Sequence, residues 1–332
     1  MSHFLVKSFQ WLLFLFLAAF LFFLAFKGVD LSNFWEEIAS AHYQWVFVSM
    51  IFAWFAFFFR AYRWKVLIES LGFKTSLWHA YHAVLIGYFS NFIFPRLGEV
   101  LRCAALNKFD KAPVDRLVGT VIVERLFDVL MMGVLTLGFI AVEFEVFRSF
   151  ISELALSFNR PDQGALMLVL LILLLIPVAL VAVYFFFTRY YPRNRLHRRV
   201  LIVLRGISNG LRSAWKLKRR GVFLWCTVGL WFCYFMMTYS LFSALDTTSG
   251  LTLSNAVFIL VIASFAFVIP AQGGIGSYHL VVSLGLTLFG ITYEDGLVYA
   301  TLAHGSQFLY TLLLGGISIL MLFLWQKKFK AS

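Results

Sequence analysis

Charged residues follow a proline at the end of an apolar run in the first half of the sequence. Pro95 ends the run that begins at Ala80, because proline lacks an N–H and its ring clashes with the preceding helical turn. Arg96, Glu99 and Arg102 come next at helical spacing, which places them on about a third of the helix circumference. Arginines hydrogen-bond to phosphate and a glutamate can orient them. This group therefore predicts a site for an anionic phosphate or, alternatively, an ion network that closes the end of a hairpin.

A second charged group lies further along the chain, in a segment that is otherwise apolar. Glu124 and Asp128 share one face of a predicted helix, and Arg125 can reach Asp128. Charge inside an apolar helix is costly and is tolerated where it lines a cavity or meets an opposite charge. These three residues are therefore candidates for the same anion site, with a self-neutralising structural cluster as the alternative.

A second break, which contains no charge, follows in the other half of the chain. Its candidate residues are a proline, three glycines and a histidine: Pro270, Gly273, Gly274, Gly276 and His279. Glycines allow close approach of the backbone, and exposed N–H groups ahead of a helix can bind phosphate. The same glycines also suit a tight turn between two packed helices. No set of His, Cys and acidic residues has the spacing of a metal site, so we expect no metal and no other cofactor.

The elements that position these residues are predicted to be membrane helices. The 332 residues are 61% hydrophobic and 13% charged, a composition that leaves too little polar surface for a soluble domain of this size. Several apolar runs of about 17–25 residues predict an all-α polytopic membrane protein. The net charge of +12 lies mostly in connections beside these runs, which argues against nucleic acid as a partner.

Six full spans are expected, three in each half of the chain. The spans of the first half, 1–142, lie at about 8–26, 44–59 and 113–142. The broken hairpin 80–106 precedes the last of these spans. Arg60, Arg63 and Lys65 follow the second span as a positive flank, so we expect that end in the cytoplasm.

The second half, 164–332, has the same order of elements. Its spans lie at about 164–187, 222–242 and 297–325. The broken hairpin 253–291 precedes the last span. The segment 188–220 contains eleven Lys or Arg and no acid, and we expect it to form an amphipathic helix on the cytoplasmic surface. The distribution of Lys and Arg places both termini in the cytoplasm and gives the two halves opposite orientations.

Two halves that have the same order of helices and opposite orientations in the membrane are typical of an inverted-topology repeat. In such proteins, paired broken helices meet near the middle of the membrane and form the site. We therefore expect the two breaks of this chain to lie side by side. Each broken segment can enter and return on one side or make two short crossings, and the loop charges fit both alternatives.

Together these motifs resemble the transmembrane region of lysylphosphatidylglycerol synthases and their stand-alone, flippase-like relatives. The resemblance covers most of the chain and is carried by three motifs: Asn91, Pro95, Arg96, Gly98, Glu99 and Arg102, then Glu124, Arg125 and Asp128, then Pro270, Gly273, Gly274 and Gly276. Family members place a glutamate shortly after the last glycine. This chain has Ser277, Tyr278 and His279 there, so the role of that acid does not carry over.

The resemblance implies lipid handling in the inner or plasma membrane without the synthase activity, since we expect no soluble aminoacyl-transfer domain. The leading hypothesis is a flippase-like transporter, not an enzyme, that moves a polar or anionic (glyco)phospholipid or a lipid-linked precursor. The alternative is a membrane-embedded transferase or helper subunit acting on a lipid-linked envelope substrate. The expected partners are membrane lipids with anionic head groups, while a homo-oligomer or an envelope-biosynthesis partner stays open.

Overall fold

The computed structural model describes residues 2–93, 97–146, 217–269 and 271–331, together with positions 148, 149 and 152. Every regular element named in these ranges is a helix, which confirms the all-α prediction for the described part of the chain. The α-helices are α1 (Ser2–Phe26), α2 (Leu31–Ser40), α3 (Tyr43–Ser70), α4 (Leu77–Ile93), α5 (Gly98–Asp110), α6 (Val114–Val142), α10 (Arg220–Phe242), α11 (Leu253–Ala266), α12 (Ser277–Thr287) and α13 (Tyr293–Ala331). Two short 3₁₀ helices, η1 (Asp246–Thr248) and η2 (Gln272–Gly274), lie on either side of α11.

Four of the described helices are long and apolar enough to cross a membrane: α3, α6, α10 and α13. They overlap the spans expected at about 44–59, 113–142, 222–242 and 297–325, although α3 continues well past 59. The span expected at 8–26 lies in α1, where Leu15–Phe26 forms a shorter apolar stretch. The span expected at 164–187 and nearly all of the basic segment 188–220 lie outside the described residues.

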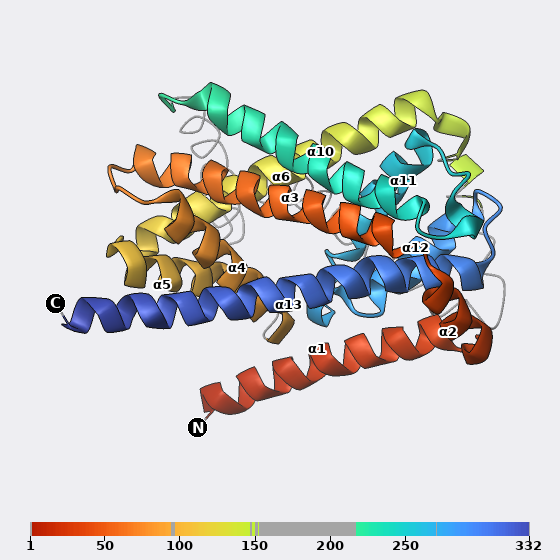
Figure 1. Cartoon of the computed structure of the whole chain (residues 1–332), viewed down its shortest axis with the longest axis horizontal. Helices are drawn as coiled ribbons and strands as arrows, with labels where there is room; N and C mark the ends of the chain where they lie inside the picture. The colour runs from red at the N-terminus through yellow and green to blue at the C-terminus, as the bar shows by residue number, and fades with distance from the viewer. Residues whose placement is uncertain are drawn as a thin grey trace, which may run out of the picture. The chain divides into compact units, whose positions relative to one another are not determined.

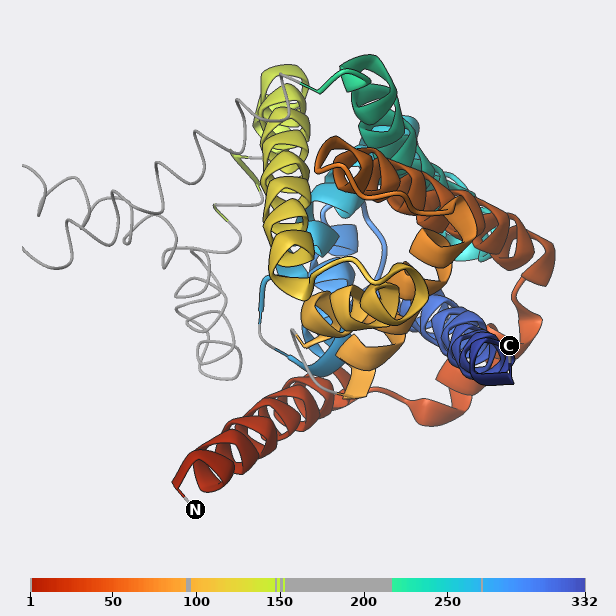
Figure 2. The same cartoon turned by 90° about the vertical axis from the view of Figure 1, so that its left-hand side faces the viewer.

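Residues 1–139 and 218–332 form one unit, in which the long helices run between two opposite ends. At one end lie the last turns of α3 and α13 and the first turns of α4, α6 and α10 (Figures 1 and 2). At the opposite end lie α2 and the first turn of α13 (Figures 1 and 2). The two hairpins therefore enter this unit from opposite ends (Figure 1). This agrees with opposite orientation of the two halves, but the repeat stays a prediction because 164–187 is not described.

The first broken segment is a helical hairpin of α4 and α5. The two helices touch where Gly87 faces Gly98, since a Cβ atom on Gly98 would lie 2.0 Å from the Gly87 carbonyl oxygen. Asn91 Oδ1 accepts a 2.8 Å hydrogen bond from the N–H of Gly98, a helix-start group that has no partner inside its helix. Both helices are shorter than the roughly 20 residues that cross a bilayer, which favours a re-entrant hairpin.

The second broken segment is also a hairpin, formed by α11 and α12 with η2 at its tip. Gly273, Gly274 and Gly276 have φ angles of 62°, 80° and 81°, in the left-handed region that favours glycine. Space restricts Gly276 as well, because a Cβ atom there would lie 2.4 Å from the backbone nitrogen of Phe22 in α1. The glycines therefore form the tight turn that was one of the two alternatives for this break, and α1 packs against it.

A buried apolar cluster fixes the first hairpin against its neighbours. It joins α3, α4, α5 and α6 through side chains such as Trp64, Leu85, Leu106 and Leu117. Trp64 Nε1 also donates a 2.8 Å hydrogen bond to the Thr120 hydroxyl, so the polar edge of the indole is satisfied inside the cluster. This packing sets the position of α3 against α6, the two helices that carry most of the buried charge.

Candidate functional site

A network of oppositely charged side chains joins α3, α5 and α6 inside the unit. It contains four arginines and three carboxylates: Arg60, Arg63, Arg102, Arg125, Glu99, Glu124 and Asp128. We call this set the arginine–carboxylate network. Arginine suits such a network because its guanidinium stays charged and presents five N–H donors in one plane.

Asp128 on α6 pairs with both arginines of α3. Its Oδ2 lies 3.1 Å from Arg60 Nη1, and its Oδ1 lies 2.8 Å from Arg63 Nη1. The two arginines are about one helical turn apart, so they reach the same carboxylate from one face of α3. Helix α10 supports them: Arg60 donates to the Tyr234 hydroxyl at 3.0 Å and Arg63 to the Thr227 hydroxyl at 3.4 Å. Asp128 is therefore the common partner that holds α3 to α6.

Glu124 connects the first hairpin to α3. Its Oε2 lies 2.5 Å from Arg102 Nη2 and its Oε1 lies 3.4 Å from Arg63 Nε. The Arg102 guanidinium also lies over the Trp64 ring, 4.7 Å from the ring centroid. Glu124 and Arg63 are 0% exposed and Arg102 is 4% exposed, so this part of the network is shielded from solvent. Such burial is tolerated only because each charge has an opposite partner.

Glu99 and Arg125 form the outer pair of the network. Arg125 Nη2 lies 2.7 Å from Glu99 Oε1, and Arg125 Nη1 lies 3.9 Å from Asp128 Oδ2. The Arg125 side chain is 45% exposed and that of Glu99 is 29% exposed. Exposed ion pairs contribute about 0–1 kcal/mol, whereas breaking a buried pair costs several. The outer pair can therefore separate far more easily than Arg102 and Glu124.

The network has spare positive charge and spare donors, because its four arginines meet three carboxylates. Four of its buried nitrogens have no hydrogen-bond partner within the described residues: Arg60 Nε, Arg63 Nε, Arg63 Nη2 and Arg102 Nε. Three buried oxygens of its carboxylates, Glu99 Oε2, Glu124 Oε1 and Asp128 Oδ1, have no partner there either. Buried donors without acceptors are unfavourable. A phosphate group would supply the missing negative charge, and its oxygens would be further acceptors for these donors.

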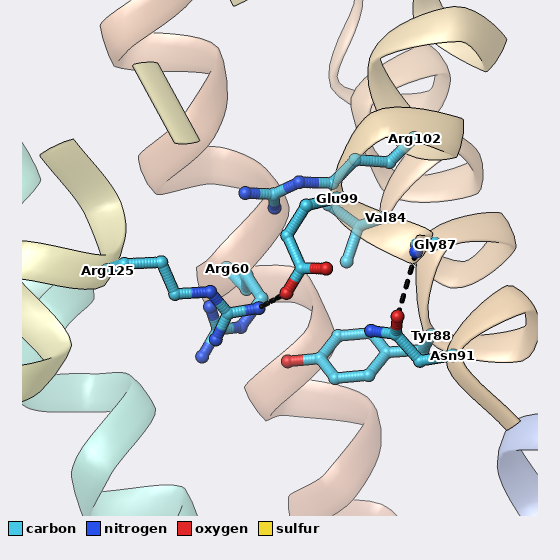
Figure 3. Close-up of a pocket in the computed structure, with 9 residues that line it drawn as sticks. Arg60, Val84, Gly87, Tyr88, Asn91, Glu99, Arg102 and Arg125 are labelled. Carbon is cyan, nitrogen blue, oxygen red and sulfur yellow. Dashed lines mark hydrogen bonds and ion pairs between the residues drawn. The ribbon is translucent and has the colours of Figure 1, made fainter. Parts of the chain in front are cut away.

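A polar pocket lies beside the network, and Figure 3 shows its lining. It is lined by Arg60, Val84, Gly87, Tyr88, Asn91, Gly98, Glu99, Arg102 and Arg125. Glu99 reaches toward Arg125, with Arg60 and Tyr88 next to them (Figure 3). The free space is about 10 Å³, close to what one water molecule needs. A phosphate can therefore enter only after wall side chains move, and the outer pair is the weakest contact in that wall.

The end of α4 and the tip of the second hairpin are in direct contact. Gln272 in η2 donates from Nε2 to the carbonyl oxygens of Phe92, at 2.7 Å, and of Ile93, at 3.1 Å. These carbonyls belong to the last turn of α4, where the helix offers no partner of its own. The Phe92 ring also lies 2.6 Å from where a Cβ atom on Gly273 would be. The tip of the second hairpin therefore caps the end of the first.

Two buried histidines form hydrogen bonds with the tip of the second hairpin, residues 272–276, which we call the second tip. His304 Nε2 lies 2.9 Å from the Gly273 carbonyl oxygen, so this nitrogen carries the proton and donates. His279 Nδ1 accepts a 3.3 Å hydrogen bond from the N–H of Gly276, and the two imidazole rings are 5.1 Å apart. Among the described residues, no group of three or more His, Cys, Asp or Glu side chains is placed to hold a metal ion.

The predicted site residues fall into two neighbouring groups. Those in the network are Glu99, Arg102, Glu124, Arg125 and Asp128. Those at the second tip are Gly273, Gly274, Gly276 and His279. The end of α4 joins the groups, since Asn91 lines the polar pocket and Phe92 contacts the second tip. Arg96 and Pro270 lie outside the described residues.

Arg60 and Arg63 belong to the network, although the sequence pattern assigned them to a cytoplasmic flank. Helix α3 continues to Ser70 and buries both side chains. The physical reason is that Asp128 and Glu124 neutralise them, and these partners come from another helix. Residues 66–68 are apolar and buried as well, and this continuing run is the signal that the helix does not end at 59.

Long apolar helices and two broken helices that meet beside buried charge define the class: this is an all-α polytopic membrane protein. Residues 11–315 match the family described as "Lysylphosphatidylglycerol synthase TM region". The chain belongs to this family, which confirms the resemblance carried by the three motifs. The "UPF0104 membrane protein MJ1595" of Methanocaldococcus jannaschii is 29% identical over 118 residues, covering 34% of this chain and 35% of that protein. No solved structure matches the chain significantly.

Proposed function

We propose that this protein is a flippase-like transporter that moves an anionic lipid with a phosphate-bearing head group between the two leaflets of the cell membrane. The observation that carries the proposal is the arginine–carboxylate network, with its spare positive charge and unpartnered buried N–H groups. Charge buried among membrane helices usually serves function, and paired broken helices are typical of transport sites. Membership of a lipid-synthase transmembrane family supports a lipid as the cargo.

The outer pair provides the point of entry in this proposal. The head-group phosphate replaces Glu99 as the partner of Arg125, because a phosphate offers the same kind of charge-assisted acceptor. Arg60 and Arg102 line the same pocket and supply further positive charge. Glu124 and Asp128 stay paired and keep these arginines in place throughout. The uncharged second tip then lets the head group pass close to the backbone.

Orientation follows from charge at the two ends of the unit. Basic residues on or beside the helix ends that meet where α5 stops and α10 starts are Lys65, Lys74, Lys108, Lys111, Arg219 and Lys327, against the acids Glu69, Asp110 and Asp115. Acids on α2, η1 and the first turn of α13, which lie at the opposite end, are Asp30, Glu36, Glu37, Asp246, Glu294 and Asp295. Because positive charge favours the cytoplasm, we infer that the first end and both termini are cytoplasmic. An impermeant thiol reagent added to intact cells should label Glu294→Cys and spare Lys74→Cys; the reverse pattern would rule out this orientation.

Transport is tested with purified protein in phosphatidylcholine vesicles that contain a trace of phosphatidylglycerol with a fluorescent chain. Dithionite bleaches only probe in the outer leaflet, so a working flippase lets it bleach nearly all of the probe. Arg125→Ala should lose this activity, while Arg116→Ala, an exposed arginine on the same helix, should keep it. Well-folded wild-type protein that leaves the inner-leaflet probe untouched would contradict the proposal.

The same vesicles distinguish the transport proposal from the transferase alternative. Mass spectrometry of the recovered lipid should show an unchanged head group if the protein only moves it. A new head-group mass, formed from an added donor without bleaching of the inner leaflet, would favour a membrane-embedded transferase.

A further inference from the structure

A second cavity lies between α1, the end of α4, the tip of the second hairpin and α13. Its free volume is about 630 Å³, within the roughly 300–1,000 Å³ typical of ligand sites. Phe22 and Phe26 of α1 form one wall, and Phe92 and Phe308 form another. The lining is apolar apart from two residues, Lys27 and Gln272. We call this cavity the apolar pocket.

The end of α4 separates the apolar pocket from the polar pocket. Asn91 lines the polar pocket, and Phe92, the next residue, lines the apolar one. One turn of helix therefore presents a charged site on one side and an aromatic-walled cavity on the other. Gln272 lines the apolar pocket at this junction, and its buried Oε1 has no hydrogen-bond partner within the described chain. Two such environments side by side match the two parts of one amphiphilic molecule.

We propose that the apolar pocket holds a hydrocarbon chain of the same anionic phospholipid whose phosphate binds the arginine–carboxylate network. The proposal rests on the proposed function for its phosphate site. A chain is the occupant favoured by the lining, because aromatic and aliphatic walls gain by excluding water while they offer no set of polar groups for a sugar or peptide. The lipid thus lies across the end of α4, with its polar part on the side of Asn91 and its apolar part on the side of Phe92.

The volume contrast between the pockets supports this arrangement. The polar pocket has room for about one water molecule, whereas the apolar pocket is already open in the same structure. The chain can therefore bind before the head group does. Binding of the chain next to Phe92 and Gln272 would place the lipid at the contact between the end of α4 and the tip of the second hairpin.

The test uses phosphatidylglycerol with a photoreactive diazirine in one chain, in phosphatidylcholine vesicles, with the labelled peptides identified by mass spectrometry. Label should concentrate on residues 15–26 and on the peptides that contain Phe92 and Phe308. A phosphatidylcholine probe with the same chains should label these peptides about tenfold less, because its head group carries no net charge for the arginines. Equal labelling by both probes, or label spread over all lipid-facing helices, would overturn the proposal.

A pocket-filling variant then connects the chain site to transport. Ala19 lines the apolar pocket and is exposed to it, so Ala19→Trp fills the cavity without displacing buried core. Phe16→Trp, on the exposed side of the same helix, is the matched control. We expect Ala19→Trp to lose label and translocation about tenfold while the control keeps both. Lost label with normal translocation would overturn the proposal. If the photoreactive lipid labels the apolar pocket of the wild-type protein but the protein moves no lipid, the site for the hydrocarbon chain is supported and the proposed function is refuted.

Discussion

Arg102 on the returning arm of the first hairpin lies 2.5 Å from Glu124 on α6, and both side chains are almost completely buried. Glu124 also faces Arg63 of α3, so a single carboxylate holds a hairpin and two long helices together. The side chains around Glu124 are buried, whereas the outer pair of the network is partly exposed. The contact therefore separates a rigid inner part of the network from a part that can exchange partners.

Glu124→Gln should destabilise the protein strongly. The change leaves Arg63 and Arg102 buried with one negative charge fewer, and breaking a buried ion pair costs about 3–5 kcal/mol of unfolding free energy. Thermal unfolding in detergent measures this loss. Asp115→Asn is the matched control, because Asp115 is an exposed acid on the same helix and should matter by about 1 kcal/mol at most. Equal melting temperatures for the two variants would contradict a structural role for Glu124.

Glu99→Gln should leave the fold intact but change transport. An exposed pair contributes about 0–1 kcal/mol, so the melting temperature should barely move. Freed from Glu99, Arg125 should hold an anionic lipid more tightly and release it more slowly. We therefore expect a lower maximal translocation rate together with tighter apparent binding of phosphatidylglycerol. Arg125→Ala should instead weaken binding, and identical kinetic changes in the two variants would exclude this exchange of partners.

Gly98→Ala should disrupt the first hairpin. The added methyl group would lie 2.0 Å from the Gly87 carbonyl oxygen, and a backbone atom cannot move aside as a flexible side chain can. Overpacking of this kind costs about 1–3 kcal/mol, measured as unfolding by denaturant in detergent micelles. Gly119→Ala on α6 meets nothing within 4 Å and should be neutral or slightly stabilising. A stable Gly98→Ala protein would show that α4 and α5 are not packed this closely.

Gln272→Glu should loosen the contact between the two hairpin tips. Glutamate has nearly the same size but, when ionised, cannot donate to the carbonyl oxygens of Phe92 and Ile93. Repulsion between its carboxylate and these oxygens should raise hydrogen exchange in residues 88–93, with little change in α10. Hydrogen–deuterium exchange measured by mass spectrometry tests this. Unchanged exchange would mean that the glutamine bond does not hold the tips together.

Glu37 should make stability depend on pH at the acidic end of the unit. Burial, and then the neighbouring Asp295 and Glu294, raise the pKa of Glu37 above its ordinary value of 4.5. The protonated form is therefore favoured in the fold, and its stabilising effect is present at low pH and lost as pH rises through the raised pKa. Glu37→Gln should melt higher than wild type at neutral pH, with the gap closing below about pH 4. A difference in melting temperature that widens on acidification would show that protonation of Glu37 destabilises the fold.

Several features of the protein are set by local sequence. The membrane class and the helices follow from the length of apolar runs, and the two breaks follow from proline and glycine, whose backbone preferences act without neighbours. Glu99, Arg102, Glu124, Arg125 and Asp128 were identified as candidates because a charge in an apolar run is costly whichever way the helix faces. For these residues, sequence alone predicts the charged groups that the fold brings together, and their role in binding stays a prediction.

Which side chains contact one another was decided only by the tertiary structure. Helix α3 is apolar on most sides, so no pattern shows which face Arg60 and Arg63 occupy, and their partners lie on α6 and α10. Gln272 reaches Phe92 across 180 residues of chain, a contact that no local signal encodes. The apolar pocket exists because α1, the end of α4, the tip of the second hairpin and α13 leave space between them. Pair distances and cavity volumes depend on how helices pack, and packing is a property of the folded chain rather than of any one segment.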